Sequence, residues 1–282
     1  ILLFSDTSVF TMTFVGQPDV FAFQQVAENA GIVGPQAAAE FNGTVFWMGN
    51  DGFYQFAGGV QQIPCSVERH VFDNLTKQQK MKCFAGINPK FNEVWWFYPT
   101  GSNDASDDIT KYVIYNYLEN SWSFGTMNRS TYQDNGVELN PLATEYFPNS
   151  NVTSITTVNG VTQGRSIIYA QESGVNADGQ PLASYIQSGD GDIADGETFS
   201  FINKIIPDFQ NQTGNATITL RVKDYPNDTA TVGETLTVSN TTSFLNTRIR
   251  GRQTNVKIEN SALDDNWRFG TLRVNIKQDG KR

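Results

Sequence analysis

The sequence has little of the material from which most catalytic and metal sites are built. Its 282 residues include one histidine and two cysteines, too few for the ligand sets of a zinc site. Charged residues make up only 17% of the chain, and leucine, lysine and glutamate are scarce, which disfavours a helical protein. No run approaches the roughly 18 to 20 apolar residues of a transmembrane helix. We therefore expect neither a zinc enzyme nor a membrane-spanning helix.

Aromatic and β-branched residues are abundant instead. Five tryptophans, ten tyrosines and twenty phenylalanines accompany many threonines and valines, a composition that predicts an all-β protein. The first residues, ILLFSDTSVFTMTF, alternate apolar and polar side chains and lack the basic flank of a signal peptide, so we expect a strand there. Because the chain starts inside a β element without a methionine, we expect it to be a fragment of a longer protein.

One helix is expected, over residues 66–82, with Ser66 as its N-cap. Its apolar residues recur at helical spacing and are predicted to face the core: Val67, Val71, Phe72 and Leu75. A straight helix of this length would hold Cys65 and Cys83 about 27 Å apart, beyond disulfide reach. Both are therefore expected to be free thiols, as in a protein assembled in a reducing cytoplasm.

The rest of the chain reads as short strands between tight turns. Asn42-Gly43 and Asp51-Gly52 each separate two apolar runs, a strong hairpin signal. A second, four-stranded meander is predicted over residues 82–127, and a strand, turn and strand unit over residues 165–187. A period of about 40 to 50 residues built from short antiparallel strands is typical of β-propeller blades. A β-sandwich is the alternative, and the repeat period favours the propeller.

Tryptophans are the candidates for packing between such blades. The candidates are Trp47, Trp95, Trp96 and Trp122. In NEVWWFYP, alternation places Trp95 and Trp96 on opposite faces, so this strand is expected to be covered on both sides. Residues 1–196 are thus predicted to form propeller-like blades with one inserted helix. Residues 197–282, with longer and threonine-rich strands, are predicted to form an antiparallel β segment, either a closing blade or a small separate β-domain.

The sequence contains no recognisable set of catalytic residues. His70 lies among charged residues on the expected helix and is interpreted as a solvated or capping residue, because no nucleophile motif accompanies it. Two loops gather carboxylates: Asp104, Asp107 and Asp108 in one, and Asp190, Asp192 and Asp195 in the other. The second loop is out of register with an EF-hand, since Ala194 occupies a ligand position. Surface turns are favoured for both loops, no cofactor is expected, and cation binding by them is left open.

Charge is unevenly distributed along the chain. Residues 245–282 contain nine lysines and arginines against four acids, a net of +5, whereas the remaining 244 residues carry a net of −14. If the segment is a strand, Arg248, Arg250 and Arg252 form one basic row on a single face. We interpret the row as a docking edge for an acidic neighbour, such as another copy of the protein. Phosphate binding is the weaker alternative, because the acidic body opposes it.

Several segments resemble one family of viral proteins. These segments cover 105 of the 282 residues: GTVFWMGNDGFYQFAGGVQQIPCSVERHVFDNLTKQQKMKCFAGINPKFNEVWWFYP, KYVIYNYLENSWSFGTMNRS, and the C-terminal IRGRQTNVKIEN and WRFGTLRVNIKQDGKR. They resemble the tail nozzle, or tail tubular, proteins of short-tailed bacteriophages, which are related to packaged-DNA stabilisation and tail hub proteins.

The resemblance implies a virion structural protein assembled in the host cytoplasm. It implies a propeller-based subunit that forms a hexameric ring below a tail adaptor, closing and then conducting the DNA channel without reading DNA sequence. It implies no catalytic residue. Two alternatives remain: an adhesin that binds glycans through exposed aromatics such as Trp95 or Trp96, and a glycan-cleaving propeller enzyme. Exposed aromatics would favour the first, and convergent carboxylates in a pocket would favour the second.

Overall fold

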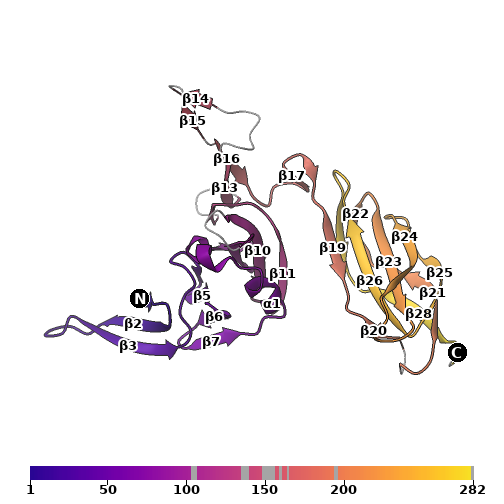
Figure 1. Cartoon of the computed structure of the whole chain (residues 1–282), viewed down its shortest axis with the longest axis horizontal. Helices are drawn as coiled ribbons and strands as arrows, with labels where there is room; N and C mark the ends of the chain where they lie inside the picture. The colour runs from indigo at the N-terminus through magenta and orange to yellow at the C-terminus, as the bar shows by residue number, and fades with distance from the viewer. Residues whose placement is uncertain are drawn as a thin grey trace. The chain divides into compact units, whose positions relative to one another are not determined.

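The computed structural model describes residues 1–102, 107–134, 140–147, 156–158, 161–163, 165–193 and 196–280. The described chain is all-β, as predicted, with antiparallel sheets and two short helical segments (Figure 1). It divides into two compact units, residues 1–173 and residues 174–282. This division comes earlier than the predicted boundary at residue 196, because β19 (Ser184–Gln187) is hydrogen-bonded to β26 (Gln253–Asn260) of the second unit.

The first unit begins with a three-stranded sheet. Its strands are β1 (Leu2–Phe4), β2 (Ser8–Phe14) and β3 (Phe21–Glu28), in that order. The opening residues therefore form strands, as their alternation predicts. β1 pairs with only the first half of β2, so the β2–β3 hairpin continues beyond it as a two-stranded arm (Figure 1).

Two four-stranded meanders follow, each with its strands in sequence order. The first meander comprises β4 (Ala38–Phe41), β5 (Thr44–Met48), β6 (Phe53–Phe56) and β7 (Val60–Ile63). The second meander comprises β8 (Phe84–Asn88), β9 (Glu93–Pro99), β10 (Ile109–Asn116) and β11 (Ser121–Thr126). Asn42 and Gly43 close the β4–β5 hairpin with φ of 50° and 79°, the positive values that a type I′ turn requires. Both predicted meanders are confirmed.

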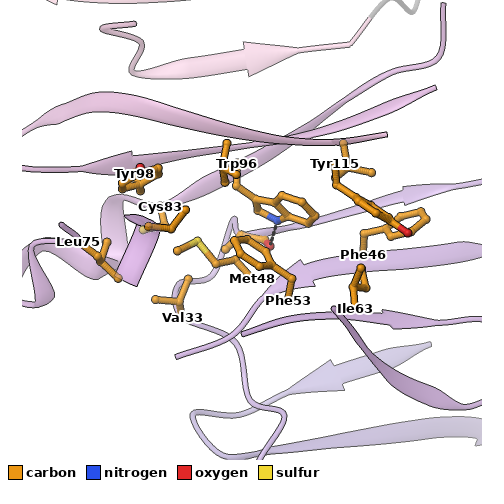
Figure 2. Close-up of a cluster of buried hydrophobic side chains, with 14 of the residues drawn as sticks. Val33, Phe46, Met48, Phe53, Ile63, Leu75, Cys83, Trp96, Tyr98 and Tyr115 are labelled. Atoms are coloured by element: carbon orange, nitrogen blue, oxygen red, sulfur yellow. Dashed lines mark hydrogen bonds between the residues drawn. The ribbon is translucent and has the colours of Figure 1, made fainter. Parts of the chain in front are cut away.

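The two meanders pack face to face across a shared apolar core (Figure 2). Met48 and Phe53 of the first meander and Trp96 of the second are fully buried there. Figure 2 shows the three side chains together, with the Phe53 and Trp96 rings 4.8 Å apart. The indole N–H of Trp96 donates a hydrogen bond to the carbonyl of Ala37 at 3.1 Å, so its one polar group is satisfied.

The opposite faces of the meanders are covered as well. Trp95 and Phe97 point away from the shared core into a second cluster, which confirms the alternation predicted for β9. There Tyr132 of a further sheet packs over both rings, at 6.4 and 5.8 Å. That sheet has the order β12 (Thr131–Gln133), β13 (Leu142–Phe147) and β16 (Arg165–Ala170). On the other side, Phe4 of β1 contacts Trp47 at 5.1 Å, so the first unit is a stack of sheets joined by aromatic layers.

A glycine in β8 allows the β12–β13–β16 sheet to pack closely against the second meander. A Cβ on Gly86 would lie 2.2 Å from Cδ1 of Tyr132, closer than any real contact. We therefore expect Gly86→Ala to lower the free energy of unfolding by about 1–3 kcal/mol, the usual cost of overpacking. Gly59→Ala is the matched control, because nothing lies within 4 Å of a Cβ there. Equal effects of the two substitutions in urea denaturation would show that the Tyr132 contact is dispensable.

The predicted helix over residues 66–82 is wrong in extent. The structure has one short helix, α1 (Glu68–Phe72), and a separate 3₁₀ segment, η1 (Lys77–Lys82). Between them the backbone N–H of Thr76 donates to the carbonyl of Pro99 in β9, so a tertiary hydrogen bond replaces a helical one. Ser66 is not the cap: the N-cap is Val67, without a side-chain hydrogen bond. The apolar stripe does face the core, as predicted.

The strand, turn and strand unit predicted over residues 165–187 is also wrong. β16 pairs with β13, whereas β19 pairs with β26 of the second unit. Two small hairpins lie before and after β16 in the sequence. They pair β14 (Thr156–Val158) with β15 (Val161–Gln163), and β17 (Asn176–Ala177) with β18 (Gln180–Pro181).

The second unit is built from two sheets that face each other. One contains β19, β20 (Gly191–Asp192), β26, β23 (Ala216–Lys223) and β24 (Thr231–Val238); the other contains β25 (Leu245–Gly251), β21 (Ser200–Ile206) and β28 (Arg273–Gln278). β22 (Phe209–Thr213) pairs with β27 (Asn266–Phe269). Ile202 and Ile249 of one sheet and Leu220 and Ile258 of the other share one core, the arrangement of a β-sandwich.

Candidate functional site

The four tryptophans predicted to pack between blades all lie in packed layers. Trp47 and Trp96 are fully buried, Trp95 is 8% exposed, and Trp122 is partly buried. Two tyrosine rings stack with the Trp95 indole, with ring centroids at 4.8 Å for Tyr112 and 6.4 Å for Tyr132. These indoles are therefore structural, and they do not form a platform on which a sugar ring stacks.

His70 is packed against an aromatic ring. It lies in the last turn of α1, and its ring centroid is 4.1 Å from that of Phe124, so it is neither fully solvated nor a cap. Burial, followed by the positive charge of Lys111, lowers the pKa of His70. The imidazole is therefore neutral at neutral pH, and its contact with Phe124 is a packing contact.

Both cysteines are free thiols, as predicted. Burial raises the pKa of Cys65 to about 11 and that of Cys83 to about 12. The thiolate is the nucleophilic form of cysteine, and it is suppressed at both positions near neutral pH. Neither residue is poised for covalent catalysis.

The carboxylates of the second acidic loop are engaged within the fold. Asp190 forms an ion pair with Lys223 and accepts a hydrogen bond from Asn255 at 2.6 Å; these two contacts, in that order, lower the pKa of Asp190. Asp192 accepts a hydrogen bond from Gln253 at 2.9 Å. These contacts agree with a surface turn tied to β23 and β26. Asp195 and Ala194 lie outside the described residues.

The first acidic loop is anchored to the segment between α1 and η1. Asp107 accepts a hydrogen bond from the buried Thr76 hydroxyl at 2.6 Å, and Asp108 lies 3.6 Å from the Lys82 ammonium. A surface pocket of about 770 Å³ lies beside this contact, lined by residues 72–77, Thr100 and Gly101. Among the described residues of its lining, Asp73 is the one carboxylate. Asp104 lies outside the described residues.

Only two of the three arginines in the predicted basic row lie on one strand. Arg248 and Arg250 are exposed on the same face of β25, but the strand ends at Gly251 and Arg252 lies beyond it. The guanidinium of Arg250 pairs with Asp279 at 2.6 Å and lies 3.9 Å from the ring centre of Phe199. Arg252 lies over Phe199 as well, at 4.7 Å. Two of the three arginines thus take part in the packing of the second unit.

The structure reveals one polar cluster that the sequence analysis missed. Glu93 at the start of β9 is directly opposite Asn88 at the end of β8, so the two side chains lie on the same face. One carboxylate oxygen of Glu93 accepts a hydrogen bond from the indole N–H of Trp95 at 2.9 Å. Burial is the main cause that raises the pKa of Glu93 to about 7, and the charge of Glu172 raises it further.

The charge of Glu172 acts on Glu93. Glu172 follows β16 in a turn where its own φ is +56°, and its side chain is exposed. Partial desolvation raises the pKa of Glu172, and Lys90 lowers it. The pKa of Tyr112 and that of Tyr132 are raised by burial and by both carboxylates. In NEVWW, strand alternation places Glu93 on the same face as Trp95. The sequence around Glu172 contains no pattern that predicts its interaction with Glu93.

Within the described ranges, no three histidine, cysteine, aspartate or glutamate side chains gather in a metal-binding group. None of the helices in this part of the chain has the length and apolar character needed to cross a bilayer. The sequence matches no protein-family model, and none of the curated proteins is significantly similar to it.

Proposed function

We propose that this chain is a structural, non-catalytic subunit of a bacteriophage tail, part of the nozzle or hub ring through which the genome is retained and ejected. The proposal rests on the resemblance of residues 43–99, 111–130, 249–260 and 267–282 to tail nozzle proteins. It includes a hexameric ring below an adaptor and localisation in the virion tail, as that resemblance implies. The acidic body suits a conduit, because it repels the phosphates of DNA passing through.

The observation that supports it best is the stacking of the two meanders. Each is a four-stranded antiparallel sheet with its strands in sequence order, and the two pack face to face around Trp96. Propellers are built from consecutive four-stranded blades that pack in this way. We therefore propose that the meanders are two blades of a β-propeller, and that the buried tryptophans hold the blades together.

The adhesin and enzyme alternatives are less well supported. Trp95 and Trp96, the aromatics through which an adhesin was expected to bind glycans, are buried. Among the described residues, the action of the Glu172 charge on Glu93 favours a glycan-cleaving enzyme, but the indole beside Glu93, Trp95, is buried and stacked with two tyrosine rings. Hydrolysis of a glycan by the wild type and its loss in Glu93→Gln would establish the enzyme instead.

The test is to locate the protein in its native particle. An antibody raised against the recombinant chain and labelled with gold should mark the tail tip of phage particles in electron micrographs. Sedimentation and negative staining of the protein should show rings. A label on some other structure, together with a monomeric protein that binds glycans on an array, would overturn the proposal in favour of the adhesin.

Arg248 offers a specific test of ring assembly. It is exposed on β25, so Arg248→Glu should change the free energy of unfolding by less than about 0.5 kcal/mol. If the basic face docks on an acidic neighbour, the variant should fail to form rings at low salt, where exposed charges act over about 10 Å or more. Arg268→Glu, also exposed and identical in charge change, is the control. Normal rings from Arg248→Glu in sedimentation would show that this face is merely solvated.

A further inference from the structure

The first sheet has an apolar face that points away from the core of its unit. Phe4, on one face of this sheet, packs against Trp47 of the first meander. Residues opposite one another in an antiparallel pair share a face, so the register of the three strands places a set of apolar side chains on the other face. We call this set the arm face: Leu3, Phe10, Met12, Phe14, Phe21 and Phe23. A sheet with one face in water is expected to be polar on that face, and this sheet is polar only at its base, where Gln25 bonds to Ser8 and Glu28.

The arm face is as large as the apolar part of a protein interface. Phe14 is 70% exposed, Phe23 63% and Phe21 49%, and the rings of Phe14 and Phe21 lie 5.9 Å apart. With about 200 Å² of surface on each aromatic side chain, these three alone leave roughly 350 Å² of apolar surface in contact with water. An apolar patch of that size is often functional. A standard interface takes about 800 Å² from each partner, a little over half of it apolar, so the arm face supplies most of the apolar area that one partner contributes.

A second uncharged face lies at the opposite end of the stack of sheets. The β12–β13–β16 sheet packs Tyr132 over the second meander, so its other side is turned away from that core. Tyr146 and Ile168 on that outer side are 51% and 70% exposed. We call its side chains the end face: Leu142, Thr144, Tyr146, Ser166, Ile168 and Ala170. All six are uncharged.

Charge favours another copy of the chain as the partner of these faces. The protein carries a net charge of −9, so two copies repel each other, and the repulsion is least where two uncharged faces meet. Asp19 is the only charged residue between positions 7 and 27. Residues 1–28 contain no lysine or arginine, the residues that attract the phosphates of nucleic acid or of anionic lipids.

We infer that the arm face of one copy packs on the end face of a second copy, so that the stack of sheets continues from one subunit into the next. Sheets already pack face to face within the first unit, and the contact between copies would repeat that arrangement. Because the two faces are different surfaces at opposite ends of the unit, the contact is heterologous and can close into a ring. The inference rests on the proposed function only for ring closure, since contact between copies can be measured in solution whatever particle they belong to.

Sedimentation velocity of the full chain tests the contact. In 1 M salt, charges are screened within about 3 Å, so the docking proposed for Arg248 is suppressed and an apolar contact remains. The wild type should associate as its concentration rises. Phe14→Glu and Ile168→Glu should each weaken association tenfold or more, because each places an unpaired carboxylate in an apolar contact. A wild type that stays monomeric at every concentration would overturn the inference.

Two matched substitutions separate the faces from the added charge. Thr13→Glu places the same charge on the opposite face of the same arm, and Leu118→Glu places it on an exposed turn elsewhere. Both should associate as the wild type does. All four variants should keep the wild-type Tm at a concentration where the wild type is monomeric, because all four positions are exposed. Equal losses of association in Thr13→Glu and Phe14→Glu would show that the arm face is not the contact.

Mixing the two defective variants tests whether the contact is heterologous. Phe14→Glu keeps an intact end face and Ile168→Glu keeps an intact arm face, so an equimolar mixture should form a one-to-one heterodimer that does not grow further. If two arm faces pair with each other instead, Ile168→Glu would associate normally and the mixture would form no heterodimer, which would refute the inference.

The same experiments identify the other occupants of the arm face. A monomeric wild type that floats with phosphatidylcholine vesicles would assign the arm face to a bilayer. A monomeric wild type in which hydroxyl radicals do not label Phe14 would assign it to another part of the same chain. Either result would overturn the contact between copies, whereas the gold label at the tail tip decides the proposed function separately.

Discussion

Trp96→Ala should destabilise the first unit by about 3–5 kcal/mol, the usual cost of truncating a large buried aromatic residue. The indole is fully buried between the two meanders, and its rings contact Phe53 at 4.8 Å and Trp122 at 6.1 Å. Truncation would remove the layer that joins the sheets and one of the two donors to the carbonyl of Ala37, which would keep only the backbone N–H of Met48. Urea denaturation monitored by tryptophan fluorescence is the appropriate measurement, because four of the five tryptophans lie in residues 1–173.

Leu118→Ala is the control for this prediction. Leu118 lies in the turn after β10 and is 68% exposed, so its truncation should change the free energy of unfolding by less than about 0.5 kcal/mol. Trp96→Phe should fall between the two, since it keeps most of the apolar contact and loses the hydrogen bond. A Trp96→Ala variant as stable as Leu118→Ala would show that the meanders are held together by something other than this aromatic layer.

Features that depend only on neighbouring residues, such as strand alternation and turn type, are predicted correctly from the sequence. In NEVWWFYP, two adjacent tryptophans cannot share one face of a strand, so coverage on both sides follows from alternation, and Trp95 and Trp96 indeed lie in different clusters. Asn42-Gly43 predicts its hairpin for a similar reason, because the turn type needs positive φ at both positions. Both are statements about neighbouring residues, and both are confirmed.

Predictions that depend on distant partners failed. The segment over residues 66–82 has a helical apolar stripe, but the helix stops because Thr76 bonds to Pro99, a strand residue that periodicity does not reveal. The strands near residues 165 and 187 look like a hairpin, yet each pairs with a strand elsewhere in the chain.

Contacts around the candidate functional residues also involve residues that are distant in sequence. Strand parity correctly places Arg248 and Arg250 on one face, but Phe199, which contacts Arg250, comes from a distant segment. Likewise the charge of Glu172 acts on Glu93, although most of the second meander and the β12–β13–β16 sheet separate the two residues in sequence. No spacing rule predicts this interaction.

The stability of the first unit should depend on pH through Glu93. In the folded protein burial, with the charge of Glu172, raises the pKa of Glu93 to about 7, whereas the ordinary value is 4.5. Between these two values the folded chain holds a proton that the unfolded chain has released, so stability decreases as pH rises. The contribution of the protonated carboxyl is fully present below pH 4.5 and is lost above pH 7.

Glu93→Gln removes this titration while keeping an acceptor for the Trp95 indole N–H. The variant should match the wild type near pH 4.5 and be more stable at pH 8, by about 1–3 kcal/mol once solvent screening at this half-buried position is allowed for. The titratable groups whose charges interact with that of Glu93 are Glu172, Tyr112 and Tyr132. Glu172 titrates in the same direction, so some pH dependence should survive in the variant.

An exposed carboxylate is the control for this prediction. Glu119→Gln changes a side chain in the β10–β11 turn and should follow the wild-type curve at every pH. If the difference between Glu93→Gln and the wild type is the same at pH 5 and pH 8 in urea denaturation, the carboxyl of Glu93 is not held protonated by its surroundings.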